Sequence, residues 1–306
     1  MGGTYHNLRG RDPAALHVWT ESLASQSRCF TRRCEVASVA AMSTDSPFDS
    51  YDHNRSAWNR EVDRGQNRWT QPVGPDVIAR ARRGDWQVVL TPTKPVPHAW
   101  FGAKDGRLDG LRILGLASGG GQQGPIFAAA GADVTTFDAS DRQLDQDRQV
   151  ATREGLSIRT VQGNMKDLSA LPGDHFDVVF NPCSLCFVDE VRPVFREVAR
   201  VLRPGGAFLC GIVNPWFFLF DSNAFDAGKL VVNRRRPYRD MDYPDMVEKF
   251  AAKGEPVEFS HTLDDLLGGQ LAAGLLLADL FEDSWSDWGP LVGVADAFLA
   301  TRAIKR

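Results

Sequence analysis

The sequence has few cysteines and no long apolar run. Five cysteines in 306 residues are too few for the dense disulfide framework of small secreted domains. No stretch of 18 consecutive apolar residues occurs, so no membrane-spanning helix is predicted, and no secretory signal is recognisable. These absences predict a cytoplasmic protein with no membrane partner.

The sequence also lacks an excess of positive charge. It has 35 basic and 39 acidic residues, for a net charge of −4. Nucleic-acid binding depends on neutralising phosphates, so we expect no nucleic-acid partner and favour a small-molecule substrate. The oligomeric state is unknown from the sequence. A hydrophobic content of 43% and a charged content of 24% are typical of a globular chain, and the length suits one α/β domain with additions.

The chain before residue 111 divides into two segments. Residues 1–41 show no clean hydrophobic period, and we expect them to be disordered or a non-native extension, with the working protein beginning near Met42. Residues 42–110 are rich in tryptophan and proline and predict an N-terminal cap. Residues 77–83 have a short helical pattern, and the prolines at 92, 95 and 97 predict an extended segment over 91–97.

From residue 111 onward, short apolar runs alternate with helical patterns. Strands are predicted at 111–116, 133–137, 157–161, 176–180 and 207–213, and helices at 122–130, 141–154 and 191–202. This alternation is typical of an α/β fold with a doubly wound, Rossmann-like, mostly parallel sheet.

The alternation stops after residue 215. We interpret residues 215–260 as an insertion in a core that spans 111–306. Two last strands are predicted at 275–282 and 295–303, and about a dozen turn-forming residues separate them. Such a connection suits a hairpin, so the sheet should end in an antiparallel C-terminal strand pair.

A glycine-rich turn follows the first predicted strand and opens a helix. Gly119 and Gly121 remove the Cβ atoms where a ligand would approach the backbone, and the helix begins with unpaired N–H groups. Together with Gly124 they also match the G-x-G-x-x-G pattern of nicotinamide cofactor sites. Asp138 ends the second strand, 17 residues after Gly121, where a carboxylate can accept from both ribose hydroxyls.

Three further segments complete an ordered set of motifs. They are Asn164-Met165 after the third strand, Phe-Asp-Val-Val at 176–179, and Val-Leu-Arg-Pro-Gly-Gly at 201–206. With the glycine turn and Asp138, this set resembles the class I S-adenosylmethionine-dependent methyltransferases over residues 111–213. The strings Lys-Pro-Val-Pro-His, Gly-Gly-Gly-Gln-Gln-Gly and Phe-Ser-His-Thr-Leu are similar to those of a bacterial subgroup of uncharacterised small methyltransferases.

The resemblance implies a cofactor, S-adenosylmethionine, and residues that bind it. Asp138, followed by Ala139, should hold the ribose, Asn164 and Met165 should meet the adenine, and Asn181 should face the sulfonium region. The methionine tail should lie along the glycine turn, at Ala117, Ser118, Gly119, Gly121 and Gln122.

Two positions depart from the pattern of the resembling family. Many members have an acidic residue where this chain has Gly115, and an Asp where it has Asn164. Asn164 can still accept from the adenine amino group. The missing acid at Gly115 removes one partner of the cofactor's ammonium.

The reaction implied is in-line methyl transfer to a small molecule, in which the protein supplies alignment and excludes water. Two alternatives stay open: an NAD(P)-dependent oxidoreductase and a non-catalytic S-adenosylmethionine-binding module. A base is required only if the acceptor loses a proton. His98 and His261 are the candidates, since histidine titrates near neutral pH. The candidate aromatic walls of an acceptor pocket are Trp69, Trp100, Trp216 and Phe217.

Other short motifs suggest competing chemistry. Asn181-Pro182-Cys183 partly matches adenine amino methylases, and its Pro-Cys pair matches cytosine C5 methylases, whose cysteine is a nucleophile. Cys183 and Cys186 form a C-x-x-C motif. Because no second cysteine pair accompanies it, the motif is weak evidence for zinc, and we predict no metal site. The turn at Ser118 lacks the first glycine of a hydrolase nucleophile elbow. The basic run at 234–236 is typical of a solvated face.

Overall fold

The structure is a computed structural model that describes residues 48–286 and 288–306. The predictions for residues 1–41 and for a start near Met42 concern residues outside this described part.

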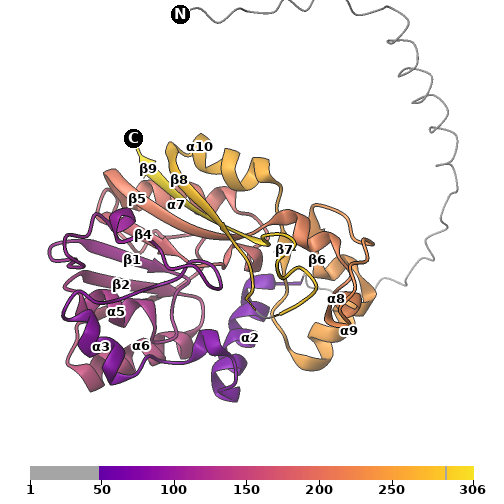
Figure 1. Ribbon diagram of the computed structural model, residues 1–306, viewed down its shortest axis with the longest axis horizontal. Helices are drawn as coiled ribbons and strands as arrows, with labels where there is room; N and C mark the ends of the chain where they lie inside the picture. Colours follow the sequence, from indigo (N-terminus) through magenta and orange to yellow (C-terminus); the bar gives the residue numbers. More distant parts are fainter. Residues whose placement is uncertain (1–47, 287) are drawn as a thin grey trace, which may run out of the picture. The chain divides into compact units, whose positions relative to one another are not determined.

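A seven-stranded sheet forms the centre of the described part (Figure 1). Its spatial order is β3-β2-β1-β4-β5-β9-β8. Neighbours among β1 to β5 pair in parallel, while β9 pairs antiparallel with both β5 and β8. The bounds are β1 Arg112–Leu116, β2 Asp133–Asp138, β3 Ile158–Gln162, β4 Phe176–Asn181, β5 Leu202–Val213, β8 Leu275–Asp283 and β9 Phe298–Lys305.

The predicted doubly wound, mostly parallel sheet with an antiparallel C-terminal strand pair is confirmed. The fifth strand is longer than predicted, because Leu202 already pairs with Phe176 before an irregularity that ends at Val178. The basic-proline-glycine turn after α7 (Arg192–Val201) is therefore part of the strand.

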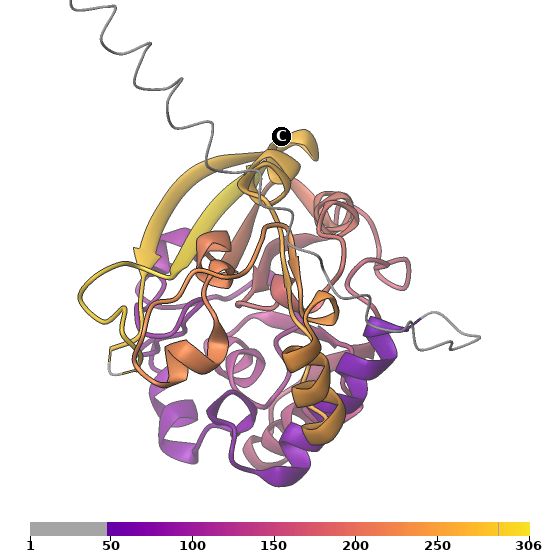
Figure 2. The ribbon, with the colours of Figure 1, turned by 90° about the vertical axis from the view of Figure 1, so that its right-hand side faces the viewer.

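Successive residues of the central strands face opposite sides of the sheet, and each side has its own apolar cluster. Leu114 and Val179 pack with α7 residues such as Phe195 on one side. Ile113 and Val178 pack on the other side, where α5 (Gln123–Ala129) and α6 (Asp141–Glu154) lie. Figure 2 shows the helices on both sides of the strands. A doubly wound sheet requires this two-sided burial.

The helix α6 begins and ends where local chemistry dictates. The hydroxyl of Ser140 accepts the N–H of Gln143 at 3.0 Å, which is the usual N-cap interaction. Gly155, with a φ of 64°, closes the C-terminus in the left-handed region that glycine adopts without strain.

Three helices precede the sheet: α2 Ser50–Arg64, α3 Pro75–Ala81 and α4 His98–Phe101, with the 3₁₀ turn η1 at Arg68–Thr70. This part of the chain contributes to the apolar cluster of Ile113 through Trp86, which lies between α3 and α4, and through Trp100 and Phe101 of α4. The segment predicted as extended over 91–97 is not helical, but it bends back instead. Val89 bridges Pro95, and the N–H of Val96 donates to the carbonyl of Val88.

The chain between β5 and β8 forms a series of small elements. They are η3 Pro215–Leu219, α8 Ser222–Asp226, β6 Tyr238–Arg239, η4 Asp240–Asp242, α9 Pro244–Lys253, β7 Phe259–Ser260, η5 Asp264–Gly268 and α10 Gly269–Ala272. Of these, η5 and α10 pack against α7 and the apolar cluster of Leu114. The strands β6 and β7 pair antiparallel as a two-stranded ribbon. Figure 1 shows this ribbon, α8 and α9 gathered beyond one end of the large sheet, with α2 beside them.

Among residues 48–286 and 288–306, no helix combines the length and the apolar character needed to cross a bilayer.

Candidate functional site

The strand order reverses between β1 and β4, which lie side by side although β2 and β3 intervene in the chain. In doubly wound sheets, ligands bind beyond the carboxyl ends of the strands at this reversal. The glycine-rich loop lies there, between β1 and α5. Its backbone is special, because Ala117, Gly120 and Gly121 have φ values of 48°, 113° and 72°.

Three consecutive amides of the glycine loop are bonded to β2 and α6. The N–H of Gly119 donates to Oδ2 of Asp138 at 3.0 Å, and the N–H of Gly120 to the carbonyl of Gln143 at 3.0 Å. The N–H of Gly121 donates to Oδ1 of Asp147 at 2.8 Å. The loop is thus held in shape by two carboxylates and one carbonyl, and these three amides already have partners.

Both carboxylates are difficult to ionise. Burial raises the pKa of Asp138 to about 6, against the opposing effect of N–H donors from Ser140 and Gly119. Burial also raises the pKa of Asp147 to about 7, and the charge of Asp138 adds to this. Two neighbouring carboxyl groups with raised pKa values, Asp147 buried and Asp138 half-buried, mark this edge of the sheet as a functional candidate.

The hydroxyl of Ser118 is buried and has no hydrogen-bond partner among the described residues. It occupies the space that a side chain at position 115 would need, because a Cβ built on Gly115 would overlap it. The departure at Gly115 is therefore compensated sterically by Ser118. An unpartnered hydroxyl costs free energy unless a ligand completes it.

The segment around η1 lies over the glycine loop. The side-chain amide of Gln122 donates to the carbonyls of Arg68 and Gln71 at 2.8 and 2.9 Å. The N–H of Val73 donates to the carbonyl of Gly121 at 2.9 Å. Gln122, predicted to line the cofactor tail, is thus used to fasten this covering segment.

The helix α2 bonds the segments that follow β2 and β4, which lie on either side of β1. Asn59 accepts from the hydroxyl of Ser140 at 2.6 Å, next to Asp138. Asn54 donates to the carbonyl of Phe187 at 3.0 Å, in the 3₁₀ turn η2 (Leu185–Phe187) that follows β4. Burial raises the pKa of Tyr51, and the charge of Asp138 contributes. The phenol of Tyr51 is therefore close enough to sense that carboxylate.

The predicted adenine-binding residues lie beside the predicted ribose ligand. The N–H of Gly163 donates to the carbonyl of Asp138 at 3.1 Å, and Gln162 donates to the carbonyl of Ala139 at 3.0 Å. The side-chain oxygen of Asn164 accepts the N–H of Lys166 at 3.0 Å. Met165 packs against the apolar cluster of Leu114. The structure brings all of these residues to one sheet edge with the glycine loop.

Asn181 lies at the tip of β4, as predicted, but its side chain hydrogen-bonds other parts of the protein. It is wholly buried, and its amide donates to the carbonyl of Leu116 at 2.8 Å and to the hydroxyl of Ser184 at 2.7 Å. It therefore joins the tips of β1 and β4. Its predicted orientation towards the sulfonium stays a prediction.

The two candidate histidines lie apart from the glycine loop and from each other. The ring of His98 is stacked on Trp86 with centroids 4.0 Å apart, and its Nε2 bonds the carbonyl of Trp86 at 2.8 Å. Among the described residues, both of these contacts are with Trp86 and neither is with a residue predicted to bind the cofactor. They favour a structural role for His98.

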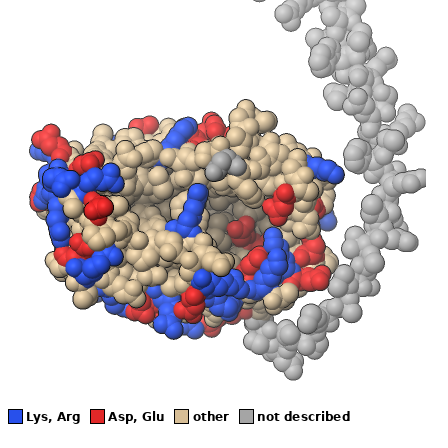
Figure 3. Space-filling model, turned by 60° about the horizontal axis from the view of Figure 1, so that its bottom comes forward, with Lys and Arg blue, Asp and Glu red and all other residues tan. Residues whose placement is uncertain are grey.

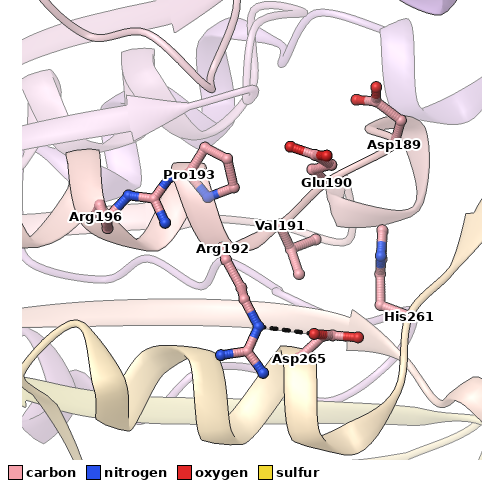
Figure 4. A pocket seen from close by; sticks show the side chains of 8 residues that line it. All are labelled: Asp189, Glu190, Val191, Arg192, Pro193, Arg196, His261 and Asp265. Carbon is pink, nitrogen blue, oxygen red and sulfur yellow. Dashed lines mark hydrogen bonds and ion pairs between the residues drawn. The ribbon is translucent and has the colours of Figure 1, made fainter.

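His261 borders a pocket of about 370 Å³ near the start of α7 (Figure 4). Its Nε2 lies 3.2 and 3.0 Å from the carbonyls of Leu185 and Val188, which fixes the proton on that nitrogen. Burial lowers the pKa of His261. The pocket contains none of the predicted cofactor residues; it is lined by Asp189, Glu190, Val191, Arg192, Pro193, Arg196, His261 and Asp265.

The structure disfavours the competing chemistry of the cysteines. Burial raises the pKa of Cys183, Cys186 and Cys210, so their thiols stay protonated and none is suited to be the nucleophile of a cytosine methylase. No cluster of three metal-ligating side chains occurs within the described part of the chain.

The interpretation of the basic run at 234–236 as a solvated face is wrong for Arg234. This guanidinium is buried, pairs with Asp245 at 2.5 Å and lies 4.3 Å from the ring centroid of Tyr243. Arg234 thus ties the chain before β6 to Tyr243 and to α9.

Three residues of this region are not predicted as functional from the sequence: Asp147, Asn54 and Tyr51. Asp147 had a usable signal, since it shares one face of α6 with Leu144 and Ala151, which are also buried, and an acid on a buried stripe needs a partner. Asn54 and Tyr51 had none, because their partners lie far away in the chain.

The chain is similar to known methyltransferases. Residues 114–210 match the family model described as a methyltransferase domain. An uncharacterised methyltransferase of Bacillus subtilis (strain 168), named YbaJ, is 46% identical over 255 residues, which cover 83% of this chain and 97% of that protein. A ubiquinone biosynthesis O-methyltransferase of Aeromonas salmonicida (strain A449) is 32% identical over 120 residues, 39% of this chain and 50% of that one.

A solved structure gives the same fold. The S-adenosylmethionine-dependent methyltransferase from Mesorhizobium loti superposes with a TM-score of 0.51 at 22% identity, covering 64% of this chain and 92% of that one. Near-complete coverage of the Bacillus subtilis relative, the methyltransferase domain match and this shared fold agree with the motifs. The chain belongs to the S-adenosylmethionine-dependent methyltransferase family.

Proposed function

We propose that this protein transfers a methyl group from S-adenosylmethionine to a small-molecule acceptor by in-line displacement. The observation that carries the proposal is the position of Asp138. Its carboxylate lies at the tip of β2, bonds the glycine loop through Gly119, and lies beside the start of the segment 163–165. A ribose ligand, a tail-binding loop and an adenine-binding segment are expected at these three places in this family.

The residues present fit the cofactor. Ser118 offers a buried hydroxyl that lacks a partner among the described residues, and it would serve the polar methionine tail. Asp138 would accept from the ribose hydroxyls, and Met165 would provide an apolar surface for the adenine. When bound, the cofactor supplies a methyl group on a sulfonium, which leaves as a neutral thioether.

The chain's own residues align the reactants and exclude water. The carbonyl bonds of Gln122 and Asn54 hold η1 and α2 over the loop and over the tip of β4. In the space-filling view, the face that is turned forward is hollowed near its middle, and an acidic side chain lies in the hollow (Figure 3). Covering the reacting atoms favours a fixed line of attack, which is the main contribution expected of a protein in methyl transfer.

The net charge of the chain and the aromatic side chains near the tip of β4 both favour a small-molecule acceptor. The net charge of −4 does not suit a nucleic-acid substrate. Aromatic side chains such as Phe187, Phe218 and Tyr238 cluster next to the tip of β4, where an acceptor would have to lie. A relative named for ubiquinone biosynthesis acts, by that name, in the formation of a small molecule.

The test is binding followed by turnover. Isothermal titration of the full chain should show S-adenosylhomocysteine and S-adenosylmethionine binding, while NAD and NADP give no heat. Radiolabelled methyl should then appear in at least one of a panel of small phenols, amines and thiols. Binding of NAD without S-adenosylhomocysteine would overturn the proposal, and cofactor binding with no turnover across the panel would favour a non-catalytic binding module.

A further inference from the structure

Glu258 has a carboxyl group that the site described above does not use. Burial raises its pKa to about 8, and the charge of Asp240 adds to this effect. Its side chain makes no hydrogen bond and no ion pair with any residue that the structure describes. The side chain is half-buried by its accessible surface, and a partly desolvated carboxyl group that lacks a hydrogen-bond donor resists ionisation.

The segment that carries Glu258 is fastened to the end of β4. Asn54 of α2 bonds both the N–H and the carbonyl of Val257, at 2.8 and 3.0 Å, as well as the carbonyl of Phe187. At the other end of the segment, His261 bonds the carbonyls of Leu185 and Val188. Residues 257–261 therefore lie along η2, directly beyond the tip of β4.

The extended chain that leads into β7 places Glu258 on the side that faces η2. Val257 and Phe259 pack with Phe250 in an apolar cluster, so Glu258 and Ser260 face the opposite way. Burial and, after it, the charge of Glu258 raise the pKa of Cys186 in η2, so the carboxyl group lies within electrostatic reach of that thiol.

Ser260 supplies a second and independent sign of a ligand. Its side chain is 3% exposed, and its hydroxyl has no hydrogen-bond partner among the described residues. Phe187, Phe218 and Tyr238 form an aromatic cluster with Cys186 next to these two groups. An unpaired carboxyl, an unpaired hydroxyl and aromatic walls suit a planar molecule that carries a hydroxyl or an N–H group.

We propose that Glu258 receives the proton of the methyl acceptor, which is a planar molecule with a reactive O–H or N–H, while Ser260 hydrogen-bonds the same molecule. This inference rests on the proposed methyl transfer. The acceptor's oxygen or nitrogen forms a bond to the methyl carbon, the carbon–sulfur bond breaks with its electron pair left on sulfur, and the acceptor's proton passes to a carboxylate oxygen of Glu258.

The groups around Glu258, together with its burial, hold the pKa of its carboxyl group near neutral pH. Asp240 and Glu255 disfavour its ionisation, while Lys249 on α9 favours it. Tyr238 is held by its hydrogen bond to Asp240 at 2.6 Å, and Cys186 stays a thiol. A base whose pKa lies near the working pH is the most effective one.

The test uses the difference between S-adenosylmethionine and S-adenosylhomocysteine, which differ by one methyl group and one positive charge. A cation that faces Glu258 lowers its pKa. Titration calorimetry near pH 7.5, in two buffers of different ionisation heat, measures the protons released on binding. The wild-type chain should release roughly half a proton more with S-adenosylmethionine than with S-adenosylhomocysteine, and Glu258→Gln should remove this difference while both ligands still bind.

The matched control is Glu248→Gln, at an exposed position of α9, which should keep the difference. A difference that persists in Glu258→Gln, or one that is missing in the wild-type chain, overturns the inference. If neither ligand binds the wild-type chain, the proposed function itself fails. A thermal melt at pH 9 checks folding separately. At that pH the carboxyl group of Glu258 is charged and destabilises the folded wild-type chain, so Glu258→Gln should have the higher melting temperature. A lower melting temperature there would also contradict the assignment. Glu258→Asp, which keeps a carboxyl group at this position, should retain the difference in proton release.

Discussion

The carboxylate of Asp147, wholly buried in α6, accepts the backbone N–H of Gly121 across 2.8 Å. This one contact couples the glycine loop to a helix on the outside of the sheet. It also makes the loop sensitive to pH, because burial raises the pKa of Asp147 to about 7.

Asp147→Asn should stabilise the protein at alkaline pH. The pKa of Asp147 is higher in the folded than in the unfolded chain, so the folded chain holds more protons, and its stability falls as pH rises through about 7. The Asn amide cannot ionise but still accepts from Gly121. We expect the variant to gain about 1–3 kcal/mol at pH 8.5 and nothing near pH 4, by urea unfolding.

The control for this prediction is Asp145→Asn, two residues earlier on the exposed side of α6, where Asp145 pairs with Arg148. It should change stability by less than about 0.5 kcal/mol at either pH. Equal stability of wild type and Asp147→Asn across the whole range would show that the carboxyl is not buried as described.

The affinity for S-adenosylhomocysteine should fall as pH drops through about 6. Below that pH the carboxyl of Asp138 is protonated and loses its capacity as a pure acceptor for ribose hydroxyls. Calorimetry should show binding about tenfold weaker at pH 5 than at pH 7.5. Asp138→Asn should bind weakly at both values, whereas Asp133→Asn, at the exposed start of the same strand, should behave as the wild type. A pH-independent affinity in the wild type would refute the ribose role.

Gly115 and Ser118 should be coupled sterically. A Cβ at position 115 would overlap the hydroxyl of Ser118, so Gly115→Ala should lower the free energy of unfolding by about 1–3 kcal/mol. Adding Ser118→Ala removes the overlapping oxygen and should recover most of that loss in a double-mutant cycle. Additive effects of the two changes would argue against the overlap.

Asn54→Ala should loosen the cover over the tip of β4. The change leaves the N–H and carbonyl of Val257 and the carbonyl of Phe187 without their partner. Unsatisfied buried groups cost about 1–3 kcal/mol each, so we expect the free energy of unfolding to fall by at least about 3 kcal/mol. Hydrogen exchange should show reduced protection at Val257, while Asp52→Asn, on the exposed side of α2, leaves both quantities unchanged.

The sequence by itself determined the sheet and the order of its parts. Apolar runs of strand length, interrupted by helical patterns with Ser140 as a cap and Gly155 as a stop, depend on neighbours close in the chain, and such local signals are strong. The same holds for Asp138, because the end of a parallel strand after a glycine turn lies at the ligand-binding edge whatever the rest of the chain does.

Only the tertiary structure decided what surrounds that edge. Asn54 bonds Val257, and the charge of Glu258 acts on Cys186, across long stretches of chain that no periodicity connects. In the folded chain, the side chains of Asn181 and His261 hydrogen-bond backbone carbonyls. From residue type and sequence position alone, both side chains are predicted to contact the reactants. The physical reason is that the environment of a polar side chain, and hence its pKa and its free hydrogen-bonding capacity, is set by which distant segments bury it.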